Sequence, residues 1–442
     1  MAIEWVIAMK IIKNLIDIDL KHSDQKHLLI NGNNGLADYI SPEDYTFLKK
    51  WCMYETIESA EADNPLLYKH MIAREYIVPD SYNEDEIRDR ICERLKAKNE
   101  KKTQKYCRVH FLLTYACNFA CPYCYEQAHR HSNRLSFEQV DKIFSIYNNE
   151  IKDIGFFGGE PLLPGNMDLI KYIISKAPSA TYNVTTNGYY LDAFIDILEQ
   201  INVVSLQITL DGSREQHNKT RILTNGRGTY DKIIDNIKLA LQRGLPTTIR
   251  MNVSPENIDD CLVAKRYIES QNWGNDHLWF DLQPIFQASH SEHDQLYASL
   301  FSNDVDATKK NLTLQHLPPI SNFLYNKVPL KPMIKACDAD CFYRFYDPHG
   351  DVYSCIASVG NKRKRIGTYW PEISVEEKSF LTRDITTIPR CRSCKYALLC
   401  GGGCANAVSP DNDITATPNC YTMFNDISNT VPRIYQLLKE QN

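Results

Sequence analysis

The sequence predicts an α/β fold, with a central barrel or open parallel sheet and a smaller unit on either side. Between residues 107 and about 290, six apolar, β-branched or aromatic runs alternate with helical patterns. Residues 1 to about 100 mix short strands with helices, and residues 337–420 are rich in cysteine and glycine with little periodicity. A chain of 442 residues is long enough for two or three domains, each with its own core.

The first unit begins with two short strands around an Asn/Gly turn, in the stretch KHLLINGNNGLADYI (26–40). A helix follows, with Ser41 as N-cap and Pro42 at its first position. Residues 64–78 and 83–98 also show helical patterns, and the polar run 96–105 predicts a linker. This order is compatible with a winged-helix-like module, and a packing domain without a binding role is the alternative.

The central region predicts strands at 107–115, 153–159, 181–188, 203–212, 247–254 and 278–285, with helices near 136–150, 166–177, 190–200, 229–243 and 257–271. Strands that alternate with helices form parallel βαβ units. In such folds the chemistry gathers at the C-terminal ends of the strands. The loop that carries Cys117, Cys121 and Cys124 directly follows the first strand, so we expect it at that edge.

Charge and composition exclude several classes of protein. Fifty basic and 55 acidic residues give a net charge of −5, so no electrostatic footprint for nucleic acid is present. No apolar run approaches the roughly 20 residues of a membrane span. The N-terminal residues lack a signal-peptide layout, which predicts a cytoplasmic protein with reduced thiols.

The 15 cysteines are unevenly distributed. Cys52, Cys92, Cys107 and Cys261 are scattered and are expected to be inert core thiols. The other eleven cluster and are the metal candidates. Three of them, Cys117, Cys121 and Cys124, lie within eight residues, whereas a zinc site takes four ligands and disulfides take an even number. The trio therefore predicts a metal centre with one open position.

The stretch CNFACPYC (117–124) resembles the CxxxCxxC signature of radical S-adenosylmethionine (SAM) enzymes, including Tyr123 before the last cysteine. Further elements follow on successive strands: GGEP (158–161), TTNG (185–188) and SLQITLDG (205–212). The resemblance implies a partial (β/α)6 TIM-like barrel and a 4Fe–4S cluster whose fourth ligand is SAM itself. It also implies that an electron from the cluster cleaves SAM to a 5′-deoxyadenosyl radical, which abstracts a hydrogen atom.

The same resemblance implies a set of SAM contacts. Gly158, Gly159 and Glu160 would bind the methionine ammonium, because a carboxylate suits that cation and glycines let the backbone approach closely. Ser205 or Gln207 would lie near the ribose, and Arg221 near the SAM carboxylate. Asn187 is a further candidate, although turn formation beside glycine explains it equally well, as it does Asp211.

A second cysteine field lies towards the C-terminus. It comprises Cys337, Cys341, Cys355, Cys391, Cys394, Cys400, Cys404 and Cys420. Without a family, eight thiolates predict two four-ligand zinc sites. Their spacing resembles the SPASM extension of radical SAM enzymes, which implies two auxiliary 4Fe–4S clusters and so three clusters in all.

In the SPASM pattern the ligands interleave. Cys337, Cys341, Cys355 and Cys404 would hold the first auxiliary cluster, and Cys391, Cys394, Cys400 and Cys420 the second. Eight residues separate Cys341 from Gly350, slightly fewer than usual in the pattern. An incompletely ligated first cluster, open to substrate, is therefore an alternative.

The resemblance implies an oxidoreductase that matures ribosomally made peptides (RiPPs) by installing a thioether or carbon–carbon crosslink. The expected domains are a leader-recognition module at 1–100, a radical SAM barrel at 107–320 and a SPASM domain at 325–436. The expected partners are a precursor peptide, whose leader adds a strand to a sheet edge, and an electron donor such as flavodoxin or ferredoxin. No nucleic acid or membrane partner is expected.

Two alternatives remain open. Sulfatase-maturing enzymes of the family carry an acidic residue directly after the cysteine at the position of Cys355, where this chain has Ile356. Isoleucine cannot act as a general base, which favours crosslinking over formylglycine formation. The non-enzymatic alternative is an iron–sulfur electron carrier or a zinc-bound scaffold.

Overall fold

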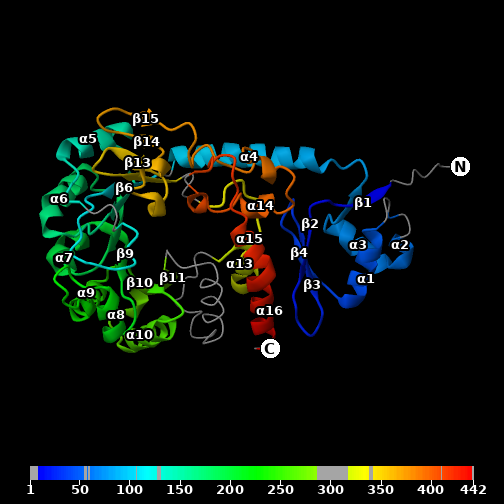
Figure 1. Cartoon of the computed structure of the whole chain (residues 1–442), viewed down its shortest axis with the longest axis horizontal. Coiled ribbons are helices and arrows are strands. Elements are labelled where there is room, and N and C mark those ends of the chain that lie inside the picture. The colour runs from blue at the N-terminus through cyan, green and yellow to red at the C-terminus, as the bar shows by residue number, and fades with distance from the viewer. Residues whose placement is uncertain are drawn as a thin grey trace. The chain divides into compact units, whose positions relative to one another are not determined.

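The computed structural model describes residues 8–53, 57, 60–105, 107–126, 131–285, 317–337, 342–409 and 411–440 (Figure 1). The chain forms two compact units. The barrel unit comprises Lys102–His316 and Asp338–Leu381, and the terminal unit comprises Met1–Lys101, Leu317–Cys337 and Thr382–Asn442. The expected division into three consecutive domains stays a prediction. Cys341 lies outside the described residues.

Six strands of the barrel unit pair in parallel, each with its neighbour along the chain. They are β6 (Arg108–Leu112), β7 (Asp153–Phe157), β8 (Thr181–Thr186), β9 (Asn202–Thr209), β10 (Thr247–Val253) and β11 (Leu278–Pro284). This order confirms the predicted α/β class with a largely parallel sheet.

Helices connect these strands and lie along the outer side of the curved sheet (Figure 1). They are α5 (Phe137–Ile146), α6 (Met167–Lys176), α7 (Leu191–Glu199), α8 (Arg214–Thr220), α9 (Tyr230–Gln242) and α10 (Ile258–Ser270). The helix α5 starts at a capping box, in which Ser136 and Gln139 exchange side-chain and backbone hydrogen bonds. Only α8 was not expected, because its seven polar residues show no apolar periodicity.

The sheet continues beyond β6 into the cysteine-rich region. The strand β12 (Tyr343–Tyr346) pairs in parallel with β6, and β13 (Asp351–Tyr353), β14 (Gly367–Thr368) and β15 (Ser374–Val375) follow as antiparallel neighbours. Gly350 turns the chain between β12 and β13 with a φ of +90°, which favours glycine. The first half of the region expected as one SPASM domain therefore packs with the barrel unit.

The terminal unit begins with two small antiparallel sheets. The strand β1 (Met9–Ile11) pairs with β5 (Ile77–Pro79), and β2 (Leu15–Asp19), β3 (His27–Asn31) and β4 (Ala37–Ile40) form a second sheet in that order. The predicted hairpin is β3–β4. The strands β1 and β5 were missed because three residues show no period, and β2 was missed although its residues LIDID alternate.

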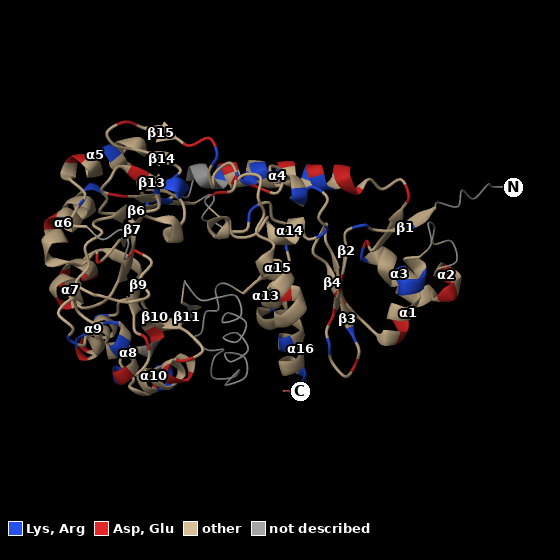
Figure 2. Cartoon of the chain, in the orientation of Figure 1, with Lys and Arg blue, Asp and Glu red and all other residues tan. Residues whose placement is uncertain are grey.

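Four helices accompany these strands: α1 (Pro42–Trp51), α2 (Ala60–Asp63), α3 (Pro65–Ala73) and α4 (Glu84–Lys105). The Ser41 side chain accepts a hydrogen bond from the Asp44 N–H at 3.1 Å, as its N-cap role predicts. Residues 96–105, expected as a linker, form the second half of α4. Figure 2 shows basic and acidic residues alternating along this helix.

The C-terminal part of the terminal unit is helical between its cysteine loops. It contains α13 (Pro319–Asn326), α14 (Ala397–Cys400), α15 (Tyr421–Asn425) and α16 (Val431–Glu440), with a π-helical turn at Asp426–Thr430. Ser321 donates a hydrogen bond from its hydroxyl to the Asp426 carboxylate. Burial raises the pKa of Asp426 to about 7.

Candidate functional site

The three-cysteine loop follows β6 and is fastened to two other segments of the barrel unit. The Glu160 N–H donates to the carbonyl oxygen of Ala116 at 2.9 Å, just before Cys117. The Ala120 N–H donates to the Ile222 carbonyl oxygen at 2.8 Å, within a short bridge between Phe119 and Leu223. Backbone bonds on both sides of Cys117 therefore hold the loop at the C-terminal edge of the sheet, where the sequence predicted it.

The two glycines of GGEP, Gly158 and Gly159, pack against the backbone that leads into this loop. A Cβ added at Gly158 would lie 2.5 Å from the Thr114 carbonyl oxygen, and one at Gly159 would lie 2.4 Å from the Ala116 carbonyl oxygen. Gly158 also has a φ of +121°, which side chains rarely adopt. Both positions require glycine because the backbone of the cysteine loop approaches them closely.

The Glu160 side chain is 0% exposed and ties the ends of β7 and β8 together. One carboxylate oxygen accepts from the Leu162 N–H at 2.8 Å and from the Thr186 hydroxyl at 2.6 Å. The other accepts from the Asn187 N–H at 2.7 Å. Burial raises the pKa of Glu160, and these hydrogen bonds oppose the rise. These contacts show that Glu160 holds the ends of β7 and β8 together. Its contact with the SAM ammonium stays a prediction.

Asn187, which donates its N–H to Glu160, also contacts the cysteine loop. Its side-chain amide donates to the Asn118 side-chain oxygen at 2.8 Å and lies 3.9 Å from the Cys117 sulfur. The Asn187 side-chain oxygen also accepts from the Tyr189 N–H at 2.9 Å, which is the turn role considered from the sequence. Asn187 therefore has the turn role and also contacts the cysteine loop, while its predicted contact with SAM stays a prediction.

A buried polar triad fixes the other end of the loop. Tyr123 donates a hydrogen bond to the Asp211 carboxylate, and Arg221 donates one to the Tyr123 hydroxyl oxygen at 2.9 Å. Arg221 also forms an ion pair with Asp211 at 4.0 Å. Burial raises the pKa of Asp211, whereas the positive charge of Arg221 lowers it. The sequence predicted Tyr123 and Arg221, but it gave no role to Asp211 beyond a turn.

His217 is hydrogen-bonded to the backbone of Asp211 in this triad. The sequence analysis did not predict this residue. Its Nδ1 atom accepts from the Asp211 N–H at 3.2 Å, and its Nε2 atom lies 3.0 Å from the Thr229 hydroxyl. That hydroxyl donates to the Arg221 carbonyl oxygen at 2.6 Å, so it accepts from Nε2. These bonds fix one neutral tautomer, in agreement with burial, which lowers the pKa of His217.

Two buried polar atoms at this edge lack a partner among the described residues. They are the side-chain nitrogen Nδ2 of Asn118 and the Nε atom of Arg221. Buried donors are normally hydrogen-bonded, so these two indicate a ligand with acceptor groups beside the cysteine loop. The carboxylate and ribose oxygens of SAM are such acceptors. The residues present therefore fit a cluster with bound SAM.

Ser205 and Gln207 lie on β9, where they alternate with the buried Leu206 and Ile208. Gln207 stands beside Thr185 of β8 in the strand register. Their predicted contact with the ribose stays a prediction.

The next two strands carry a polar pair that the sequence analysis left out. Arg250 of β10 lies opposite Asp281 of β11, and their side chains form an ion pair at 3.1 Å. The Gln283 amide donates to the same carboxylate at 2.6 Å. The signal in the sequence was the alternation of these polar residues with apolar ones in TTIRMNV and LWFDLQP.

The hairpin of β12 and β13 is tied to the segment that precedes Cys117. The Tyr115 hydroxyl donates to the Asp347 carboxylate at 2.9 Å, and the other carboxylate oxygen accepts from the N–H groups of His349 and Asp351. Burial raises the pKa of Asp347 to about 6. Asp347 thus fixes the turn between β12 and β13 from a fully buried position.

The proposed ligands of the second auxiliary cluster all belong to the terminal unit: Cys391, Cys394, Cys400 and Cys420. Burial raises the pKa of Cys400 to about 12, and the negative charges of the other three thiols act in the same direction. Cys400 therefore lies within electrostatic reach of the other three sulfurs. Cys337 and Cys404 lie in the same unit, and Cys355 lies in the barrel unit.

Three consecutive glycines shape the loop between Cys400 and Cys404. Gly401, Gly402 and Gly403 have φ values of +63°, +83° and +73°. A Cβ at Gly403 would lie 1.8 Å from the carbonyl oxygen of Asn419, the residue before Cys420. This left-handed turn, which only glycine adopts readily, places Gly402 and Gly403 against the backbone of Asn419, next to Cys420.

Within the described part of the chain, no three His, Cys, Asp or Glu side chains lie close enough together to hold a single metal ion. A cubane contains four irons and takes one thiolate on each. Its ligands therefore stand further apart than those of a single ion.

Comparison with known proteins defines the class of this chain. Residues 111–268 match the Radical SAM superfamily, and this segment contains the three-cysteine loop, GGEP and Arg221. This segment is thus a radical SAM domain, as the resemblance of the three-cysteine loop predicted.

Particular relatives are similar over different shares of the chain. A probable GTP 3′,8-cyclase of Methanocella arvoryzae is 32% identical over 133 residues, which are 30% of this chain and 42% of that protein. A cysteine-type anaerobic sulfatase-maturating enzyme of Clostridium novyi is 24% identical over 286 residues, which are 58% of this chain and 74% of that protein. The matches with the GTP 3′,8-cyclases of Methanocella arvoryzae and Clostridium botulinum thus span less than half the length of those proteins.

Solved structures share the fold. SuiB of Streptococcus suis bound to the precursor peptide SuiA is similar over 94% of this chain and 99% of its own, with a TM-score of 0.51 and 15% identity. Native anSMEcpe with bound AdoMet and the Kp18Cys peptide is similar over 76% of this chain and 99% of its own, with a TM-score of 0.56 and 15% identity. Among the helices that the structure describes, none has the length and apolar character needed to cross a membrane.

Substitution of Cys117, Cys121 or Cys124 by Ala is expected to abolish SAM cleavage, because each would remove one expected ligand of the cluster that SAM would complete. The auxiliary clusters should remain, so about eight of about twelve irons per chain should be retained. The measurements are 5′-deoxyadenosine formation and iron content. The control is Cys52→Ala, which removes a thiol outside both cysteine fields. Cys52 was expected in the core but is exposed, because it stands at the C-cap of α1. Wild-type 5′-deoxyadenosine formation by any of the three loop variants would contradict the assignment.

Glu160→Ala is expected to weaken SAM binding about tenfold to a hundredfold, the equivalent of about 1.5–3 kcal/mol for a charge-assisted hydrogen bond. It should also lower the melting temperature, because the donors of Leu162, Thr186 and Asn187 lose their acceptor. Titration with SAM and thermal unfolding measure the two effects. Glu215→Ala removes an exposed carboxylate from α8 and should change neither. Unchanged SAM affinity in Glu160→Ala would exclude the role of this side chain.

Proposed function

We propose that the chain is a radical SAM maturase that abstracts hydrogen from a ribosomally made precursor peptide and installs a thioether or carbon–carbon crosslink. The observation that carries the proposal is an open strand edge with an apolar pocket beside it, in the same chain as the three-cysteine loop. Similarity of fold to SuiB, whose structure is described with a bound precursor peptide, supports the same function.

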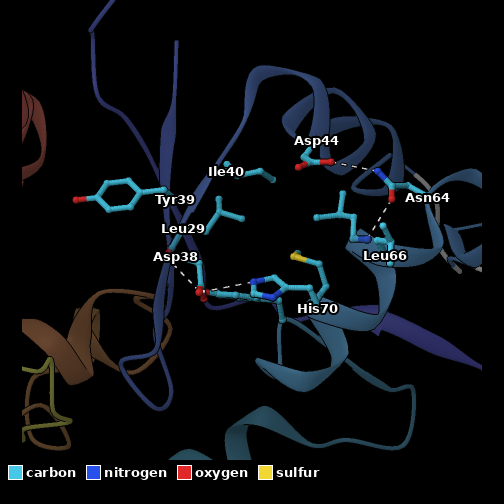
Figure 3. A pocket seen from close by; sticks show the side chains of 11 residues that line it. Leu29, Asp38, Tyr39, Ile40, Asp44, Asn64, Leu66 and His70 are labelled. Carbon is cyan, nitrogen blue, oxygen red and sulfur yellow. Dashed lines mark hydrogen bonds and ion pairs between the residues drawn. The ribbon is translucent and has the colours of Figure 1, made fainter. Parts of the chain in front are cut away.

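The pocket lies between the edge strand β4 and the helix α3 and has a volume of about 390 Å³ (Figure 3). Among the described strands, β4 pairs only with β3, which leaves its other edge for an added strand. The Ala37 carbonyl oxygen at that edge accepts a hydrogen bond from Arg74 at 3.2 Å, so a bound leader strand would have to replace this bond. Leu29, Ile40, Leu67 and Met71 form its apolar lining, and Leu66 stands at its rim. A leader segment with an apolar anchor fits this combination of backbone edge and pocket.

Acidic side chains border the same pocket. Asp38 lies 3.6 Å from the His70 ring nitrogen and accepts a hydrogen bond from Arg74 at 2.7 Å. Asp44 accepts from the Asn64 amide at 3.1 Å. Figure 3 shows these groups on both sides of the opening. They would select a leader without acidic residues next to its anchor, since like charges repel at this distance.

The barrel unit would supply the chemistry. Cys117, Cys121 and Cys124 would hold the cluster, which together with bound SAM supplies a hydrogen-abstracting 5′-deoxyadenosyl radical. Glu160 keeps the ends of β7 and β8 in place, and Arg221 would donate its unpartnered Nε–H to a SAM oxygen. The paired side chains of Arg250 and Asp281 would orient peptide groups at the polar face of the sheet.

The second cysteine field would hold the two auxiliary 4Fe–4S clusters of a SPASM domain. Cys391, Cys394, Cys400 and Cys420 would hold one, and Cys337, Cys341, Cys355 and Cys404 the other. A reduced flavodoxin or ferredoxin would provide the electron that starts each turnover.

Formylglycine formation is the second candidate, because the Clostridium novyi sulfatase-maturating enzyme matches over 74% of its own length. Against it, the residue directly after Cys355 is Ile356, which is 43% exposed and has no proton-accepting group. The general base expected at that position is therefore absent, which favours crosslinking.

Co-expression with the peptide encoded by a short reading frame beside the gene is expected to yield a product lighter by two hydrogens per crosslink, detected by mass spectrometry. The Cys121→Ala variant is the control and should leave the peptide unmodified. A peptide that the wild-type enzyme leaves unchanged, or converts to the mass of a formylglycine product, would contradict the crosslinking function.

Leu66→Glu is expected to weaken leader binding at least tenfold, because it places a charge at the rim of an apolar, acid-bordered pocket. SAM cleavage by dithionite-reduced enzyme should be unchanged. Leu66 is 84% exposed, so stability should change little. Fluorescence anisotropy of a labelled leader peptide measures the affinity.

Met53→Glu is the matched control, since Met53 is 78% exposed in the same unit and does not line the pocket. Equal leader affinity in the Leu66 and Met53 variants would show that the pocket is not the leader site. A point variant is preferable to deletion of residues 1–100, because deletion would also remove α4, whose Cys92 packs with Ile388 and Cys391.

A further inference from the structure

Two buried arginines lie beside the second cysteine field, and neither forms an ion pair with a described residue. Arg383 is 0% exposed, and Arg88 of α4 is 7% exposed. All hydrogen bonds of both guanidinium groups go to backbone carbonyl oxygens. The Nε atom of Arg383 has no partner among the described residues. Buried charges are normally paired, so we expect a negatively charged group beside these two cations.

Arg383 contacts the loop that joins two proposed ligands. Its guanidinium donates to the carbonyl oxygens of Gly402 at 2.6 Å, Gly403 at 3.1 Å and Thr417 at 3.3 Å. These carbonyls lie between Cys400 and Cys404 and just before Cys420. The positive charge therefore sits within the left-handed glycine turn that shapes the cysteine field.

Arg88 contacts the same field from the N-terminal part of the terminal unit. It donates to the carbonyl oxygens of Cys391 and Arg392. Glu84 stands four residues earlier on α4, but its carboxylate accepts from the N–H groups of Lys13 at 2.7 Å and Asn14 at 3.1 Å. The ion pair that this spacing allows on a helix is therefore not formed.

Both arginines contact the backbone of the loops that carry the four cysteines. Arg88 donates to the carbonyl oxygen of Cys391 itself, and Arg383 donates to that of Gly402, which follows Cys400 closely in the chain. A 4Fe–4S cluster with four thiolates carries a net charge of about −2 when oxidised and about −3 when reduced. Such a cluster would supply the counter-charge that the described residues lack.

We propose that Arg88 and Arg383 are the counter-charges of a cluster on Cys391, Cys394, Cys400 and Cys420, and that they raise its reduction potential. This inference rests on the part of the proposed function that places a cubane on these cysteines. The reduced cluster is the more negative form, so a nearby cation stabilises it more than the oxidised form. The helix α4 would thus tune the reduction potential of this cluster through Arg88. The proposed leader pocket lies on other elements of the same unit, α3 and β4.

The test is an EPR-monitored redox titration of the reconstituted full-length protein. It uses the Cys121→Ala background, which removes the signal of the SAM-binding cluster. Arg88→Gln and Arg383→Gln are each expected to lower one midpoint potential and leave the other unchanged. The expected effect is about tenfold in the equilibrium constant for reduction, which is about 59 mV for a one-electron couple. Arg88→Lys and Arg383→Lys keep the charge and should retain most of the wild-type potential.

Arg90→Gln is the matched control, because Arg90 is exposed on the same helix and pairs with Glu86. It should change neither midpoint. Loss of about four irons per chain in the Gln variants, with full iron content in the Lys variants, would also support a counter-charge. Unchanged midpoints in fully loaded Gln variants would overturn the proposal, as would equal iron loss in the Lys and Gln variants.

Iron and zinc analysis of the wild-type protein separates this proposal from the one on which it rests. Zinc in place of iron at the second field would overturn both the auxiliary clusters and the tuning role. Full iron content with unchanged midpoints in the variants would overturn the tuning role alone.

Discussion

The site depends on the carboxylate of Glu160, which holds the ends of two parallel strands and the cysteine loop in one frame. Its oxygens accept hydrogen bonds from Leu162, Thr186 and Asn187, and its own N–H donates to Ala116 just before Cys117. A fully buried carboxylate is stable only when such donors surround it. The ends of β7 and β8 must therefore stay together, and they fix the position of Cys117, the first cysteine of the loop.

Buried positive charge is the second constraint. In the barrel unit, Arg221 is held by Tyr123 and Asp211 beside the three-cysteine loop. In the terminal unit, Arg88 and Arg383 contact only backbone carbonyls of the second cysteine field among the described residues. Iron–sulfur clusters with thiolate ligands are anionic, so a guanidinium group near each cysteine field would limit the cost of burying a cluster there.

The parallel strands β6–β11 and most helices between them were predictable because each buries an apolar face with a clear period, whereas β12–β15, of two to four residues each, were not. The helix α8 was not, since its residues Arg214–Thr220 are polar and serve to place Arg221. The strands β1 and β5 pair with each other across a long stretch of chain, and three residues give no period. The capped start of α1 at Ser41 was predictable because the cap is a local hydrogen bond.

The sequence by itself determined the radical SAM class, because the three-cysteine loop and the motifs at the strand ends are local patterns that carry their own chemistry. Only the tertiary structure showed that Asp211 and His217 position Arg221, and that Arg88 reaches Cys391. It also divided the second cysteine field, since β12 pairs with β6 while residues 382–442 pack with the N-terminal part. The physical reason is that a buried charge is stabilised by the residues that lie near it in the folded chain. The spacing of residues along the sequence does not show which residues these are.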